Sequence, residues 1–203
     1  MRAVPRWALL SSAAAPVFLI GGWTLAASRQ PGGFDQVGDT ISALAAVDAA
    51  DRWIMTIGLL GLGLCHCLTA AGLRSARPAG RLLLALGGVA TLAVAALPLP
   101  AMSGASAPHR AAAVVSFGTL ALWPALAAPT RRPPGDAAAV PASHGLVATA
   151  LLLVLAGWLV VELVGGGAWL GLAERVVAGA EALCPLLAVL ALGAGRRPAG
   201  DSP

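Results

Sequence analysis

Six apolar stretches, each long enough to cross a bilayer, constrain the fold of this chain more than any other feature. A spanning helix needs roughly 20 apolar residues, because the hydrocarbon core is about 30 Å thick and each residue rises about 1.5 Å. Backbone in lipid must satisfy its own hydrogen bonds, and the unbroken apolar runs exclude alternating strands. The sequence therefore predicts an all-α integral membrane bundle of six transmembrane helices, at residues 7–27, 53–73, 82–100, 111–128, 144–164 and 174–194.

The composition agrees with a membrane protein and excludes an ordinary soluble domain. Only 11% of the residues are charged, whereas soluble domains carry about 25%. The net charge of +4 does not indicate a nucleic-acid partner, because the basic residues fall between the apolar spans. The Pro-rich stretch at residues 129–144 is typical of a linker within one bundle, so residues 1–203 form a single predicted membrane domain.

The arginines predict the orientation, because basic residues stay on the cytoplasmic side of short loops. One set of ends and loops carries nine of them, at positions 2, 6, 74, 77, 81, 131, 132, 196 and 197. The opposite set carries four, at positions 29, 52, 110 and 175. We therefore expect a multi-pass protein of the inner (cytoplasmic) membrane with both termini cytoplasmic. The first apolar run is longer than that of a signal peptide, so we expect it to be retained as a helix.

The polar stretch Phe34–Trp53 lies in the first outer loop and holds four of the nine acidic residues. Asp39 is a good helix N-cap, and Ile41, Leu44 and Ala45 follow at helical spacing. These features predict a short surface helix at residues 40–49, with an apolar face that closes the outer mouth of the bundle.

Glu181 is the polar residue that is hardest to explain by structure alone. It lies about seven residues into the sixth window, roughly 10 Å below its outer end, where a carboxylate normally faces the bundle interior. Other polar residues are expected at a similar depth or just above it. Together they predict a ligand-binding pocket lined by Asp35, Asp39, Ser42, His109, Arg110, Glu174, Arg175 and Glu181. The alternative is an ion-pair network that only pins the helix ends together.

The three histidines do not predict a metal or haem site. His109 is expected outside, His144 begins the fifth window inside, and His66 lies about 12 Å from the inner end of the second. They cannot readily converge as zinc ligands. Cys65 and Cys67 flank His66, but adjacent helical residues point about 100° apart. We therefore expect no metal and no cofactor, and a packed polar contact for His66.

Several short motifs resemble those of a family of prokaryotic membrane proteins catalogued as domain of unknown function 998. The motifs are Thr40–Ala43 after an acidic loop, His109 followed by Ser116 and Phe117, and Gly171, Leu172 and Arg175 before the last helix. The family usually has Glu where this chain has Ala43. The resemblance spans nearly the whole chain and implies a six-helix membrane protein, but it implies no reaction.

Three classes of function fit these observations. The first is a membrane protein whose outward-facing polar pocket binds a small molecule or a lipid headgroup. The second is an enzyme that acts on a lipid or acyl substrate at the outer leaflet, with Asp39 or Glu181 as general base and His109 as its partner. The third is an accessory subunit that packs against another membrane protein or a second copy. Membrane lipids are the expected partners in each case, and the sequence does not decide whether the protein is an enzyme.

Overall fold

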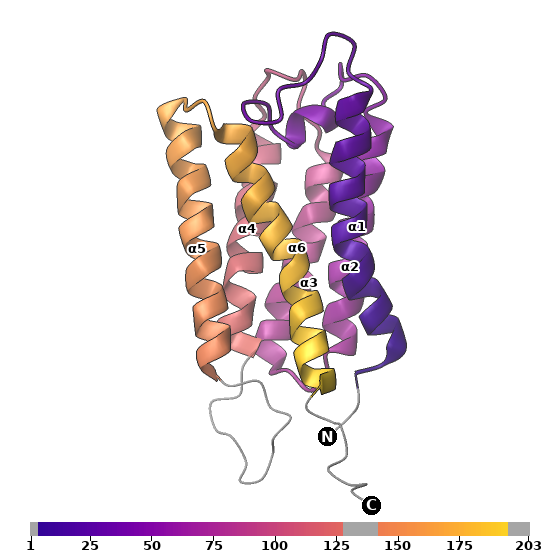
Figure 1. The fold of residues 1–203 in the computed structure, drawn as a ribbon, viewed down its shortest axis with the longest axis vertical. Coiled ribbons are helices and arrows are strands. Elements are labelled where there is room, and N and C mark those ends of the chain that lie inside the picture. Colours follow the sequence, from indigo (N-terminus) through magenta and orange to yellow (C-terminus); the bar gives the residue numbers. More distant parts are fainter. Residues whose placement is uncertain (1–3, 128–141, 195–203) are drawn as a thin grey trace, which may run out of the picture.

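A computed structural model describes residues 4–127 and 142–194, in which six long helices pack side by side (Figure 1). Every one of the six is long and apolar enough to cross a membrane. The predicted all-α membrane bundle is confirmed in this part of the chain. Its elements are α1 (Arg6–Ser28), a 3₁₀ turn η1 (Ser42–Ala45), α2 (Trp53–Gly72), α3 (Pro78–Ala96), α4 (Ala107–Ala127), α5 (Ala142–Gly165) and α6 (Leu170–Ala194).

Prolines explain why both ends of the third helix are displaced from their predicted positions. The third helix is predicted at residues 82–100 but runs from Pro78 to Ala96, four residues earlier. Pro78 suits the first turn of a helix, where no backbone N–H is needed. Pro98 disfavours a helical conformation for Leu97, which is the C-cap of α3. Both α4 and α6 also begin four residues earlier than predicted.

Consecutive helices pack against each other, and α6 closes the arrangement by packing against α1. Glycines allow the closest approaches. A Cβ atom on Gly58 of α2 would lie 2.8 Å from the Phe18 carbonyl oxygen of α1, and one on Gly88 of α3 would lie 2.7 Å from Cys67 Sγ of α2. Small residues at these positions therefore let the helix backbones approach closely.

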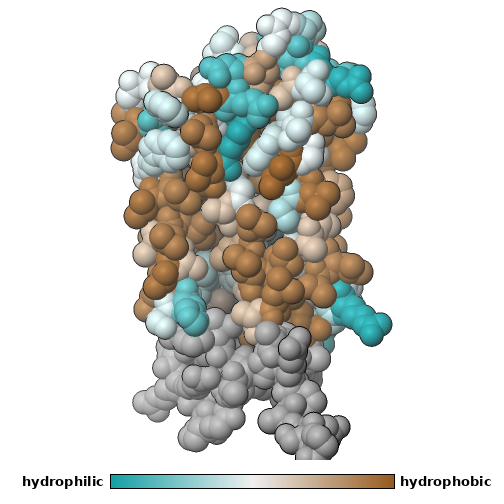
Figure 2. Space-filling model, in the orientation of Figure 1, coloured by the Kyte–Doolittle hydropathy of each residue, from teal (hydrophilic) through white to brown (hydrophobic). Residues whose placement is uncertain are grey.

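On the face that Figure 2 shows, hydrophobic residues cover the middle of the bundle and hydrophilic residues gather at the loop end. The start of α1 and the last residues of α6 lie on the same side of the bundle. The loop between α1 and α2 lies on the opposite side (Figure 1). Arg74 and Arg77 belong to the turn between α2 and α3, on the side of the termini. Five further arginines on which the orientation depends, at positions 2, 131, 132, 196 and 197, lie outside the described residues.

The first long loop contains less helix than predicted. Instead of a helix over residues 40–49, only the 3₁₀ turn Ser42–Ala45 forms. Ala46 is extended, and the Val47 N–H donates to the Leu99 carbonyl, 3.0 Å away, so the chain turns toward the connection between α3 and α4. Asp39 is not its N-cap; the Thr40 hydroxyl accepts the Ala43 N–H at 3.1 Å.

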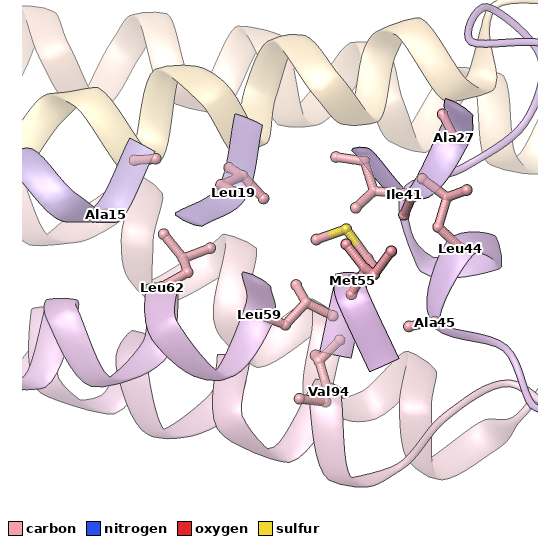
Figure 3. Close-up of a cluster of buried hydrophobic side chains, with 14 of the residues drawn as sticks. Ala15, Leu19, Ala27, Ile41, Leu44, Ala45, Met55, Leu59, Leu62 and Val94 are labelled. Carbon is pink, nitrogen blue, oxygen red and sulfur yellow. The ribbon is translucent and has the colours of Figure 1, made fainter. Parts of the chain in front are cut away.

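This turn sinks into the end of the bundle and does not lie flat on its surface. Ile41, Leu44 and Ala45 are buried in one apolar cluster with residues of α1 and α2. Figure 3 shows Ile41 and Leu44 beside Met55, at the loop end of this cluster. The apolar side of the loop therefore covers the bundle interior, as the sequence predicts, but as a buried plug. We call Ile41–Ala45 the plug.

Candidate functional site

A small cavity of about 50 Å³ lies inside the bundle, beneath the plug. We call it the chamber. Apolar residues form most of its wall, including Leu19 of α1 and Leu59 and Leu62 of α2, which Figure 3 shows between the two helices. The polar residues of its lining come from the plug and from four helices. They are Ser42, His66, Thr91, Ser116, Glu174 and Glu181.

Glu181 of α6 brings a carboxyl group to the chamber wall. Its side chain is 2% exposed, and its Oε1 atom has no hydrogen-bond partner among the described residues. Ala178, one helical turn earlier, lines the same chamber. The prediction from sequence that Glu181 faces the bundle interior agrees with this position. Its free oxygen can accept a hydrogen bond from any donor that enters the chamber.

His66 of α2 faces the same chamber and is 1% exposed. Neither ring nitrogen has a partner within the described part of the chain. The expected packed polar contact is therefore not formed. Leu59 and Leu62 lie seven and four residues earlier and share the chamber-facing side of α2. A neutral imidazole has one donor and one acceptor nitrogen, and here both are free.

The other polar groups of the chamber satisfy one another. Thr91 Oγ1 of α3 lies 2.8 Å from Ser116 Oγ of α4, and it donates to the Gly87 carbonyl at 2.9 Å. In the sequence, Ser116 belongs to a motif that resembles the family, whereas nothing predicts Thr91 or His66 as lining residues. The free hydrogen-bonding capacity of the chamber is therefore concentrated on Glu181 and His66.

Glu174 holds the plug in place at the upper wall of the chamber. Its carboxylate accepts the Ile41 N–H, and it also accepts the Ser42 hydroxyl at 3.0 Å. Hydrogen bonds to an ionised acceptor are roughly twice as strong as neutral ones. One side chain of α6 thus fixes the segment that separates the chamber from the loop end of the bundle.

Arg175 binds the preceding part of the same loop. Its Nη1 donates to the Asp39 carbonyl at 2.7 Å and to the Gly171 carbonyl at 2.9 Å. Its guanidinium carbon lies 5.4 Å from the centroid of the Phe34 ring, within the range of a cation–π contact. The Leu172 N–H donates to the Val37 carbonyl at 2.9 Å. The first two turns of α6 therefore organise the loop.

The predicted lining residues divide into two groups. Ser42, Glu174 and Glu181 line the chamber, whereas Asp35, Asp39, His109, Arg110 and Arg175 do not. Asp35 and Asp39 are exposed and accept hydrogen bonds from loop backbone at 2.9 and 3.1 Å. His109 Nδ1 is paired with the Leu97 carbonyl at 2.7 Å, and Arg110 is exposed. These residues organise the loops above the chamber.

The comparisons with known proteins bear on the whole bundle. A family model described as "Protein of unknown function (DUF998)" matches residues 12–193. The chain belongs to this family. No curated protein and no solved structure matches it. The DUF998 match runs from α1 to α6 and so includes every residue of the chamber.

The motifs that resemble this DUF998 family occupy two places in the structure. Ser42, Ser116 and Phe117 line the chamber. Gly171 and Arg175 bind the loop: a Cβ atom on Gly171 would collide with the Asp39 carbonyl, so only glycine fits beneath the loop there. The family motifs therefore build the chamber and its cover.

The size of the chamber limits what this DUF998 protein can hold there. A water molecule needs about 10–15 Å³ of such space, whereas drug-sized ligands occupy pockets of about 300–1,000 Å³. The chamber therefore accommodates a few molecules the size of water, or one very small polar ligand. Within residues 4–127 and 142–194, no three His, Cys, Asp or Glu side chains converge as metal ligands.

Proposed function

We propose that this DUF998 protein binds a small polar molecule in the chamber, with Glu181 and His66 as its principal ligands. The single observation that supports this proposal is that both side chains are buried at one cavity with free hydrogen-bonding atoms. Burying an unpaired polar group costs about 1–3 kcal/mol in proteins. Polar residues inside a membrane normally face a bundle interior or a wet cavity and mark binding or transport sites.

The lining indicates the chemistry of the ligand. It contains two carboxyl groups, three hydroxyl groups and one imidazole, and no arginine or lysine. Such a wall favours a molecule that donates hydrogen bonds and is neutral or positively charged. An anionic phosphate would face two acidic side chains without a balancing cation. The proposal therefore favours a small molecule over a phosphate headgroup.

The plug gives the ligand its route. Ile41 and Ser42 of the plug line the chamber, and the Glu174 carboxylate accepts hydrogen bonds from the Ile41 N–H and the Ser42 hydroxyl. The sequence assigns nine of the thirteen arginines to the predicted cytoplasmic side, so the positive-inside rule supports an extracytoplasmic position for the plug. The chamber then receives its ligand from outside.

The two other classes of function have weaker support. An enzyme that uses His109 needs this residue beside a carboxylate at a cavity, but His109 pairs with the Leu97 carbonyl. The pair that does share a cavity, Glu181 and His66, has room for neither a lipid nor an acyl chain. A purely structural subunit gives no reason for two buried groups without partners.

Ethanolamine is a suitable probe, because it is small and carries both a cationic amine and a hydroxyl. We expect it to raise the thermal unfolding temperature of the purified full-length protein, since a ligand that binds only the folded state stabilises it. Glu181→Gln and His66→Phe should fold but lose this shift. Glu162→Gln is the matched control, because Glu162 lies in the last turn of α5, away from the chamber.

Two results would contradict the proposal. One is an ethanolamine shift in Glu181→Gln as large as in the wild type, which would place the site elsewhere. The other is equal loss of expression in Glu181→Gln and His66→Phe with no shift in the wild type, which would make both residues structural.

A further inference from the structure

A second hollow lies on the outside of the bundle, between α1 and α2. It has a volume of about 270 Å³ and shares no residue with the chamber. We call it the α1–α2 groove. Its wall is almost entirely apolar, and its residues are Ala14, Val17, Phe18, Gly21, Gly22, Leu25, Trp53, Ile54, Ile57 and Gly58.

The groove spans one leaflet of a bilayer. Along α1 it extends from Ala14 to Leu25, eleven residues apart, which corresponds to about 16 Å of helical rise. Half of the hydrocarbon core measures about 15 Å. On α2 the groove uses only the first turns, Trp53–Gly58, so it lies in the half of the bundle nearest the loop. This length matches one acyl chain, whereas a neighbouring transmembrane helix would cross both leaflets.

Glycines create the hollow. Gly22 and Gly58 face each other where α1 and α2 pack most closely: a Cβ atom on Gly22 would lie 3.2 Å from Gly58 Cα. Gly21, in contrast, faces open space, and a Cβ atom there would meet nothing within 4 Å. Packing between the two helices therefore does not require a glycine at position 21. The absence of a side chain at Gly21 leaves space that a bound molecule can fill.

An indole ring lines the groove, and two arginines stand at the ends of the helices that form it: Arg29 caps the end of α1 and Arg52 the start of α2. Trp53 is 59% exposed and donates its indole N–H to Asp51 Oδ1 at 3.2 Å; indole rings favour the headgroup level. Arg52 precedes Trp53; its Nε atom is buried and has no partner in the described chain. Arg29 follows Leu25 by one helical turn. The Gln30 side chain links the end of α1 to the segment before α2. Its Nε2 donates to the Ala50 carbonyl at 2.9 Å, and its Oε1 accepts the Ala50 N–H at 3.1 Å.

We propose that the α1–α2 groove binds one acyl chain of an anionic phospholipid and that Arg29 and Arg52 hold its phosphate. The groove supplies an apolar slot of the depth of one leaflet, and the arginines at the end of α1 and the start of α2 supply charge complementarity to a phosphate. Arginine suits this role because its planar guanidinium can donate two parallel hydrogen bonds to a phosphate. The site is independent of the ligand proposed for the chamber.

Native mass spectrometry of the full-length protein tests this site. The protein is equilibrated with equal amounts of phosphatidylglycerol and phosphatidylcholine, and the retained lipid is counted. We expect the wild type to retain one phosphatidylglycerol preferentially. Gly21→Leu should fill the groove and reduce this retention at least tenfold. Gly157→Leu is the matched control, because Gly157 also lies on an exposed helix face with nothing within 4 Å of its Cβ position.

The preference between the two lipids tests the role of the arginines separately. The double substitution Arg29→Gln with Arg52→Gln should remove the preference for phosphatidylglycerol over phosphatidylcholine while one lipid is still retained. Equal retention by Gly21→Leu and the wild type would overturn the proposal. So would a wild-type dimer that Gly21→Leu dissociates, since the occupant would then be a second copy of the chain.

Discussion

Glu181 carries a carboxyl group into the apolar interior of a helical bundle, and its Oε1 atom has no partner in the described residues. A residue kept for stability alone would not leave this atom free, because an unpartnered buried group costs free energy. Natural proteins often keep destabilising groups at sites where they act. The free energy of unfolding can therefore distinguish a functional from a structural carboxyl group.

We predict that Glu181→Met raises the free energy of unfolding by about 1–3 kcal/mol, the desolvation penalty of one unsatisfied polar group. Met has a similar length and suits an irregular cavity wall. Equilibrium unfolding in detergent measures the change. Glu162→Met should instead be destabilising, because Glu162 accepts hydrogen bonds from Trp158 Nε1 at 3.2 Å and the Trp169 N–H at 3.0 Å. A loss of about 3–5 kcal/mol in Glu181→Met would indicate a buried ion pair and contradict the prediction.

For single residues, the sequence predicts well how deep a side chain lies along its helix, but poorly in which direction it points. Ser42, Glu174 and Glu181 line the chamber as expected, because position along a helix follows from counting residues. The sequence predicts a packed polar contact for His66, but it does not indicate the direction in which the side chain points. A membrane helix is apolar nearly all round, so the periodicity that reveals the buried face of a soluble helix is weak. Only the helical spacing of Leu59, Leu62 and His66 indicates that these three side chains share one face of α2.

The plug is the element on which access to the chamber depends. Its fold is stabilised by apolar burial of Ile41 and Leu44 and by two hydrogen bonds to Glu174. The sequence predicts that an apolar segment closes the bundle, because the spacing of these residues is visible. The length of the helix is not predictable in the same way, since Val47 and Asp48 bond to the Leu99 carbonyl and the Met102 N–H, far away in the sequence.

We predict that Glu174→Ala loosens the plug without unfolding the bundle. A hydrogen bond to a charged group contributes about 1.5–3 kcal/mol, and about 1.4 kcal/mol corresponds to a factor of ten. Amides of residues 41–46 should therefore exchange hydrogen at least about tenfold faster, as measured by mass spectrometry. Glu162→Ala should accelerate exchange only near Trp169, whose N–H it releases. Unchanged exchange at residues 41–46 would mean that apolar burial alone holds the plug.

Across the whole molecule, the even number of helices places both ends of the described bundle on one side (Figure 1). Six apolar windows are sufficient to predict this arrangement, because the lipid environment allows few alternatives. The sequence also predicts which loops share a side, and hence which arginines are grouped. Neither the windows nor the arginines reveal how the helices rotate about their axes, and this rotation is what brings His66, Thr91 and Glu181 to one cavity.

The orientation of the bundle decides whether the chamber opens to the outside or to the cytoplasm. We predict that Val47→Cys, in the loop and 55% exposed, reacts in intact cells with a membrane-impermeant maleimide. Ser143→Cys is exposed at the start of α5, at the opposite end of the bundle from Val47. It should react only after the membrane is permeabilised. Both are made after Cys65, Cys67 and Cys184 are replaced by Ala, since all three native cysteines are free thiols. The reverse pattern would place the plug in the cytoplasm, and the proposed ligand would then enter from inside the cell.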